Sequence, residues 1–241
     1  CARLMEEAER RNLTLMVDHI FVYTPAVAKI HELMRQPEFG DVLYYDSVRA
    51  NLGLFQSDVN VLWDLAVHDL SIINHVLPAT PIAVSATGIR HFEGVENTAY
   101  LTVFFDNPVI AHLSVNWLAP VKIRQVMIGG RKRMIVYDEV EPSEKVKVYD
   151  KGVEVGRQTN PENARKILVS YRTGDVWAPH LEHVEALRNV FGHFHDCVAG
   201  GQRPLTGGEA GLGVVRILEA AEQSMRHRGQ PVDLSSIVVT G

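Results

Sequence analysis

The chain has 241 residues, of which 46% are hydrophobic and 22% are charged, with a formal net charge of −5. This composition is typical of a soluble globular protein that buries a sizeable core. No run of basic residues interleaves with aromatics, which argues against nucleic-acid binding, and no apolar stretch is long enough to span a membrane. Cys1 and Cys197 are too few for a disulfide framework, which favours a reducing, cytoplasmic location.

The first part of the chain predicts helices around one strand. Residues 2–13 form an amphipathic helical pattern that continues directly into an apolar segment, so we expect further sequence upstream of Cys1. Thr24 as cap and Pro25 in the first helical position predict a helix that ends near Gln36. A strand is expected over 41–50, and a helix over 58–77 that stops at Pro78.

From Pro81 to about Gln158 the pattern changes to period-2 runs separated by turns, which predicts antiparallel strands. The turn at residues 106–108 predicts a hairpin in which two runs share one apolar face. The members of these runs are Ala99, Leu101, Val103 and Phe105 on one side and Val109, Ala111, Leu113 and Val115 on the other.

The last part of the chain predicts two helices. Residues 182–199 carry apolar side chains at three-and-four spacing, and we expect this stripe to cover the sheet; it contains Val184, Leu187, Phe191, Phe194 and Val198. A final helix is expected after a capping box of Thr206 and Glu209. The predicted fold class is α/β (α+β), a large, open, mainly antiparallel sheet covered by helices on one face.

The helix over 58–77 places Asp64, His68, Ser71 and His75 on one stripe. Such a stripe is compatible with a solvated helix face. However, no Lys, Arg or Glu occurs between Arg49 and Arg90, so the helix lacks the long charged residues that usually coat a solvent-facing surface. The short polar residues therefore also fit the lining of a pocket.

Asp64 and His68 are four residues apart, so the carboxylate and the imidazole can meet on an α-helix. An imidazole that donates to a carboxylate has its tautomer fixed and keeps its other nitrogen free to accept a proton. The pair therefore predicts His68 as a general base that is held by Asp64.

Other polar residues leave alternatives open. Lys122 and Arg124 follow a strand, and Tyr171 and Arg172 lie in a polar loop; either pair is compatible with solvated surface or with substrate binding. The histidine pairs allow a metal-dependent hydrolase, but without neighbouring carboxylates they favour exposed positions, and no metal site is predicted. These pairs are His180 with His183 and His193 with His195.

No G-x-G-x-x-G segment occurs, and the glycines of residues 207–213 lie within a predicted helix. The fingerprint of a dinucleotide site is therefore missing from this sequence.

Four ordered segments resemble the glucose-fructose oxidoreductase / inositol dehydrogenase / MocA (Gfo/Idh/MocA) family over about residues 17–234. The segments are WDLAVHD, NWLAPVKIRQVMIGG, YRTGDVWAP and HFHDCVAGGQRPLTGGEAGLGVVRILEAA. The resemblance implies a dihydrodipicolinate-reductase-like C-terminal domain over residues 18–241, preceded at 1–17 by the last helix and strand of a Rossmann domain. It implies NAD or NADP, with the main cofactor site upstream of Cys1.

The resemblance also implies a sugar, sugar nucleotide or related polyol as substrate, and a homo-oligomer formed through the sheet. His68 maps to the family's base, with Asp64 as its partner. Asn51, Lys122, Arg124, Tyr171 and Arg172 are candidates for substrate binding. Because hydride transfer needs a positioned nicotinamide, this chain alone is expected to be inactive. The alternative is a non-catalytic sugar-binding or dimerisation module of the same fold.

Overall fold

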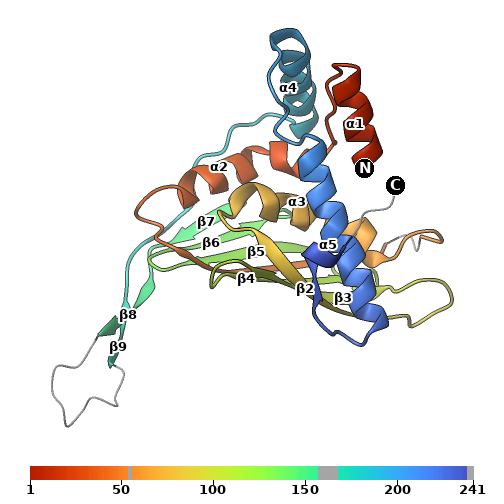
Figure 1. Cartoon of the computed structure of the whole chain (residues 1–241). Coiled ribbons are helices and arrows are strands. Elements are labelled where there is room, and N and C mark those ends of the chain that lie inside the picture. The colour runs from red at the N-terminus through yellow and green to blue at the C-terminus, as the bar shows by residue number, and fades with distance from the viewer. Residues whose placement is uncertain (54–55, 157–167, 238–241) are drawn as a thin grey trace.

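The chain folds into one open sheet with helices on one face (Figure 1). The computed structural model describes residues 1–53, 56–156 and 168–237. The sheet has nine strands in the order β10-β7-β6-β5-β1-β4-β3-β2-β11, and β8 and β9 form a separate two-stranded hairpin. Only β1 and β4 pair in parallel among the described strand pairs, which confirms a mainly antiparallel sheet.

The helices are α1 (Ala2–Arg10), α2 (Pro25–Met34), α3 (Val67–Val76), α4 (Ala186–Gly200) and α5 (Gly208–Arg226), with the short helices η1 (Ile20–Tyr23), η2 (Leu62–Ala66) and η4 (Leu234–Ser236). The strands are β1 (Val42–Ala50), β2 (Pro81–Ile89), β3 (Thr98–Phe105), β4 (Ile110–Asn116), β5 (Ile123–Gly130), β6 (Met134–Asp138), β7 (Val146–Tyr149), β8 (Gly152–Gly156), β9 (Leu168–Arg172), β10 (Val176–Trp177) and β11 (Val232–Asp233).

Local sequence signals explain where the helices begin. The Thr24 hydroxyl accepts a hydrogen bond from the backbone N–H of Val27, and Pro25 occupies the first position of α2, as predicted. Before α3, the amide oxygen of Asn60 accepts the N–H groups of Leu62 and Trp63. The turn that follows is a π-helix, η2, which continues directly into α3.

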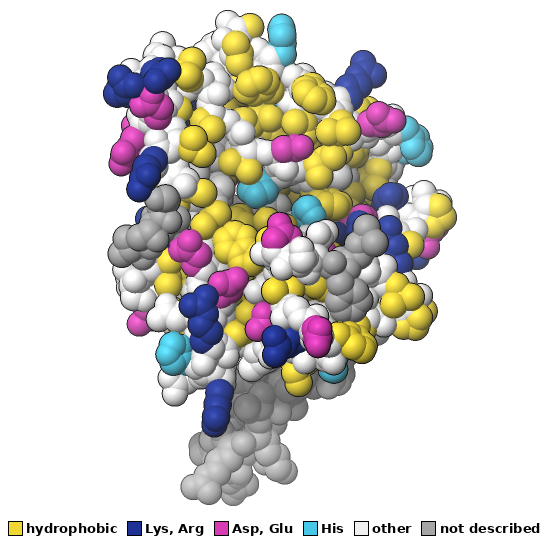
Figure 2. Space-filling view, turned by 90° about the vertical axis from the view of Figure 1, so that its right-hand side faces the viewer, with side chains coloured by type: hydrophobic (Ala, Val, Ile, Leu, Met, Phe, Trp, Pro, Cys, Tyr) yellow, Lys and Arg dark blue, Asp and Glu magenta, His cyan; other side chains and the backbone are white. Residues whose placement is uncertain are grey.

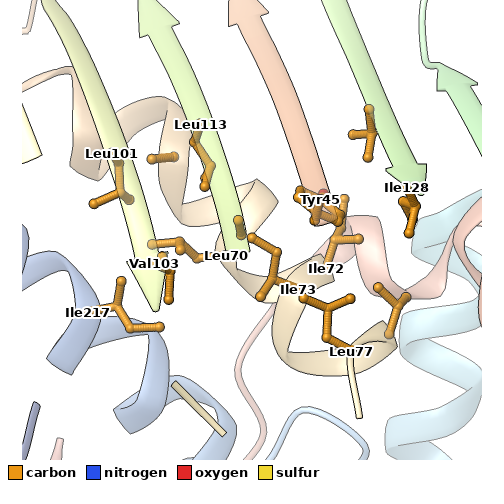
Figure 3. Close-up of a cluster of buried hydrophobic side chains, with 14 of the residues drawn as sticks. Tyr45, Leu70, Ile72, Ile73, Leu77, Leu101, Val103, Leu113, Ile128 and Ile217 are labelled. Carbon is orange, nitrogen blue, oxygen red and sulfur yellow. The ribbon is translucent and has the colours of Figure 1, made fainter. Parts of the chain in front are cut away.

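The core lies between the sheet and the helices α2, α3 and α5 (Figure 3). Ile72 and Ile73 of α3 point into a cluster that includes Tyr45 of β1 and Leu113 of β4. Because successive side chains of a strand point to opposite faces, every second side chain lies on this buried face. The predicted hairpin pairing is confirmed, since Leu101 faces Leu113 and Val103 faces Ala111 in the register of β3 and β4.

The helix predicted within residues 182–199 is present, but the prediction that it covers the sheet is wrong. Helix α4 stands away from the sheet, and it packs through Val190 against Val22 and Tyr23 of η1 (Figure 1). Four residues of the predicted stripe are exposed: Leu187, Phe191, Phe194 and Val198. Periodicity shows that a helix has an apolar face but does not show which surface that face meets.

The predicted capping box is also wrong. The N-cap of α5 is Gly207, which makes no side-chain cap bond. The hydroxyl of Thr206 instead donates to the carbonyl of Val17 and pairs with the hydroxyl of Tyr23. A buried tertiary contact therefore takes the hydroxyl that the local motif would use. None of the helices in the described ranges has the length and apolar character needed to cross a membrane.

Candidate functional site

His68 lies in the first turn of α3, and its half-buried ring meets the Phe21 ring of η1 edge to face, with 4.7 Å between centroids. The guanidinium carbon of Arg49 lies 4.7 Å from the centroid of the same Phe21 ring. Phe21 therefore links the imidazole of His68 to a buried cation on β1. A tightly packed aromatic ring between them limits the orientations that the imidazole can adopt.

Arg49 is held by two carboxylates. Its Nε and Nη2 donate to the two carboxylate oxygens of Asp69, at 3.2 and 3.0 Å, and its Nη1 donates to Glu139 at 3.0 Å. Only 2% of the Arg49 side chain and 1% of the Asp69 side chain is exposed. Burial favours the neutral form of Arg49, but Asp69 and Glu139 outweigh burial and raise its pKa, so the guanidinium is charged.

Arg124 completes this network. It stands directly opposite Arg49 in the register of β1 and β5, a like-charge pairing that is unfavourable by itself. Glu139 bridges the two cations, because its second carboxylate oxygen accepts from Nη1 of Arg124 at 2.6 Å. Two positive and two negative side chains thus balance beside His68.

The surroundings hold His68 in its neutral form. Burial lowers the pKa of His68, the positive charges of Arg49 and Arg124 lower it further, and the pKa falls to about 4. The carboxylates of Asp64 and Glu139 act in the opposite direction. A neutral imidazole at pH 7 has a free lone pair, which a general base requires.

Asp64 does not hydrogen-bond to His68. Its carboxylate accepts from the indole N–H of Trp117 at 2.8 Å, and it influences His68 through its charge. The prediction assumed the α-helical spacing that places residues four apart on one face. Leu62–Ala66 is instead a π-helix, so Asp64 and His68 point in different directions. Asp64 lies in the site, but the direct contact predicted from its spacing is wrong.

Asn51 and Lys122 differ in their surroundings. The Asn51 side chain lies near Trp117, where an added Cβ on Gly53 would meet both residues, and its Oδ1 is buried without a partner among the described residues. Lys122 is exposed just before β5. Asn51 therefore borders the site through Trp117, while the side chain of Lys122 faces solvent.

Arg172 lies on β9, outside the nine-stranded sheet. Its Nη1 pairs with Asp150 at 2.8 Å, and Asp150 also pairs with Arg133 at the start of β6. Glu139 follows the other end of β6, about 20 Å away at roughly 3.3 Å per residue. The structure therefore does not bring Arg172 next to His68. The Tyr171 side chain lies outside the part of the chain that is described.

A cavity of about 700 Å³ opens beside the network. Its walls are η1 and the start of α2, the loop after β6, and residues 178–186. Phe21 and Glu139 line it, so it reaches the groups that surround His68. This volume can hold a small organic ligand such as a sugar.

The histidine pairs do not form a metal centre. His180 and His183 line the cavity, whereas His193 accepts the backbone N–H of Leu205 and His195 is exposed. Within the described residues, no group of three or more histidine, cysteine or acidic side chains could hold a metal ion.

Sequence reasoning missed Arg49, Asp69, Glu139, Phe21 and Trp117. One signal was available: Arg49 shares the strand face of Tyr45 and Ser47, which alternation places inside. A buried arginine requires a buried acid, and Asp69 directly follows His68. Glu139 and Trp117 carry no comparable signal, because no sequence pattern pairs them with Arg124 and Asp64.

Residues 27–136 match the family model described as "GFO/IDH/MocA C-terminal domain". Residues 27–136 therefore form part of a Gfo/Idh/MocA C-terminal domain. The chain is 26% identical over 203 residues to the UDP-N-acetylglucosamine 3-dehydrogenase of Acidithiobacillus ferrooxidans, a match that covers 82% of this chain and 61% of that relative. The chain therefore spans less than two thirds of the length of this curated relative.

Two solved structures share the fold of this Gfo/Idh/MocA domain. The aldose-aldose oxidoreductase from Caulobacter crescentus, complexed with glycerol, has a TM-score of 0.77 at 15% identity and covers 97% of this chain and 68% of its own. An oxidoreductase from Agrobacterium radiobacter, in complex with NAD+, L-tartaric acid and magnesium, has a TM-score of 0.72 at 15% identity, with 98% and 70% covered. The predicted family and fold class are confirmed.

The imidazoles of His68 and His75 should stay neutral above about pH 5. Burial lowers the pKa of His75 to about 4, with a further contribution from His31, and the pKa of His68 is also about 4. Unfolded histidine binds its proton near pH 6.5, so the free energy of unfolding of this Gfo/Idh/MocA domain falls as the pH drops from about 6.5 to about 4. NMR titration measures the titration midpoint of each imidazole, with a His68→Gln variant to assign the His68 signal. A His68 midpoint above pH 6 would contradict the prediction.

Replacing Arg49 by Met should destabilise this Gfo/Idh/MocA domain by about 3–5 kcal/mol, because Asp69 is then buried without its cation. The double variant Arg49→Met with Asp69→Leu should recover much of that loss. Urea unfolding measures both, and Arg10→Met, at an exposed position, serves as the control. Equal losses in the single and double variants would mean that packing, rather than the ion pair, explains the effect.

Proposed function

We propose that this chain is the substrate domain of a nicotinamide-dependent oxidoreductase that interconverts a hydroxyl and a keto group on a sugar, sugar nucleotide or related polyol. The observation that carries the proposal is the neutral His68 imidazole, whose neighbours Phe21 and Glu139 line a cavity of about 700 Å³. The names of the dehydrogenase and aldose oxidoreductase relatives support a sugar-like substrate.

His68 acts as the base in this reaction. Its neutral ring accepts the hydroxyl proton of the substrate, and the imidazolium that forms is stabilised by the negative charges of Asp64 and Glu139. A bound NAD or NADP supplies the hydride acceptor. In the reverse direction, His68 returns the proton to the carbonyl oxygen. Arg124 and Asn51 are the candidates to bind further oxygens of the substrate.

The residues of this chain suit the nicotinamide chemistry but not the pyrophosphate of the cofactor. A neutral base is what hydride removal from an alcohol requires. The glycines of residues 207–213, by contrast, lie at the N-cap of α5 or within that helix rather than in a turn after a strand. We therefore infer that a separate nucleotide domain holds the cofactor, with residues 1–17 as its last helix and strand.

An exposed apolar surface supports such a second domain. In Figure 2, hydrophobic side chains gather over the upper part of the molecule, where α1 and α4 lie. Phe191, for example, is 68% exposed. A contiguous exposed apolar surface of this kind marks an interaction site. Its members are Leu4, Leu13, Leu187, Phe191, Phe194, Val198 and Leu205.

The uncovered face of the sheet supports a homo-oligomer. Helices α2, α3 and α5 cover one face only (Figure 1), and the other face presents Tyr44, Tyr100 and Ile110. Tyr100 and Ile110 are both substantially exposed. A second copy that packs on this face would remove these side chains from water.

The cofactor should bind only when the nucleotide domain is present. Titration of NADH and NADPH, followed by tryptophan-to-nicotinamide energy transfer, compares this chain with the protein extended upstream. Binding is expected for the extended protein alone, because residues 1–53, 56–156 and 168–237 show no glycine-rich turn between a strand and a helix that would bind a phosphate. Equal binding by the short chain would contradict this account, and no binding by either would favour the non-catalytic module.

In the complete enzyme, His68→Ala should lower kcat by at least 10²-fold, the usual effect of losing a general base, while NADH binding is unchanged. Steady-state kinetics over a pH series measures this. His195→Ala is the matched control, since that imidazole is exposed and pairs only with its neighbour Asp196 among the described contacts. Wild-type turnover in His68→Ala would remove the mechanistic basis of the proposal.

A further inference from the structure

The charges of the four-residue network beside His68 sum to zero. Arg49 and Arg124 are matched by Asp69 and Glu139, and Glu139 is the member that contacts both cations. We propose that Glu139 is a specificity-determining residue: by neutralising Arg124 it makes the site accept neutral hydroxyl groups and reject carboxylates. This inference rests on the proposed function, because it names the charge class of the sugar that the same site takes.

The geometry assigns Glu139 a distinct place in the network. Asp69 is 1% exposed and serves Arg49 alone, through two hydrogen bonds. Glu139 is 19% exposed, lines the cavity, and divides its two oxygens between the two arginines. Its backbone N–H also donates to the carbonyl of Arg124 at 2.9 Å. Glu139 therefore lies between the cations and any ligand in the cavity.

Arg124 is the cation that Glu139 controls. Its side chain is 22% exposed, and its Nε is buried without a partner among the described residues. Glu139 is the one carboxylate paired with Arg124 in the described network, whereas Arg49 keeps Asp69 if Glu139 is lost. Removal of the Glu139 charge therefore frees a single partly exposed guanidinium without leaving a buried charge unpaired.

The other charges of the cavity also disfavour anions. Glu144, Glu182 and Glu185 line it together with one lysine, Lys145, and the imidazoles of His180 and His183. Asp64 adds a further negative charge near His68. A freed Arg124 would be the one guanidinium positioned to form a charge-assisted, bidentate contact with a substrate carboxylate.

The test compares a sugar with its uronic acid. Methyl β-D-glucoside and methyl β-D-glucuronide differ only in a hydroxymethyl or carboxylate group at one carbon, and their binding to this chain is followed by NMR shifts of His68 and the Trp117 indole. The wild-type chain should prefer the glucoside. In Glu139→Gln the affinity for the glucuronide relative to the glucoside should rise about tenfold, the effect of one hydrogen bond to a charged group.

Three further variants separate charge from structure. Glu139→Asp keeps the carboxylate and should retain the wild-type preference. Glu141→Gln removes a nearby charge that interacts with Ser143, the backbone of Glu144 and Lys147 but not with Arg124, and should leave the ratio unchanged. Glu139→Gln combined with Arg124→Gln should abolish the gain, because the freed cation is gone.

The outcomes distinguish the two proposals. If both sugars bind and Glu139→Gln leaves their affinity ratio unchanged, the role of Glu139 is wrong while the sugar site stands. If neither sugar binds to the wild-type chain, the sugar site is wrong, and the specificity proposal is overturned with it.

Discussion

The buried ion pair of Arg49 and Asp69 is the interaction on which the rest of the site depends. Arg49, near the end of β1, makes two hydrogen bonds to the carboxylate of Asp69, in the first turn of α3. Asp69 directly follows His68 in the sequence. Removing two charges from water is costly, so the pair persists because each of the three guanidinium nitrogens donates to a carboxylate. It thereby fixes α3 on the sheet, holds the cation against Phe21, and sets the electrostatic surroundings of His68.

The charge network also explains why His68 remains neutral. Two arginines lie side by side on neighbouring strands, an arrangement that only a bridging acid makes acceptable. Their combined charge and the burial of the ring disfavour the imidazolium, while Asp64 and Glu139 limit that effect. The basicity of His68 is thus a balance among four side chains from four different segments, and a change in any of them alters it.

Much of the fold followed from the sequence. Period-2 runs identified the antiparallel strands, the turn at 106–108 set the register of β3 and β4, and Thr24 with Pro25 located the start of α2. These features depend on neighbours in the chain, which sequence patterns report directly. The errors concerned contacts with distant residues: the stripe of α4 is exposed, and Thr206 bonds to Val17 and Tyr23.

For the site, the sequence by itself predicted His68 and Asp64 and showed the absence of long charged residues around them, since these are properties of one helix. Only the tertiary structure decided what surrounds them. The π-helical turn directs Asp64 to Trp117, and the strand register brings Arg124 beside Arg49 while Arg172 lies at the far end of β6. The reason is physical: spacing along a helix determines which side chains share a face, whereas burial, pairing and charge balance depend on segments that meet only in the folded sheet.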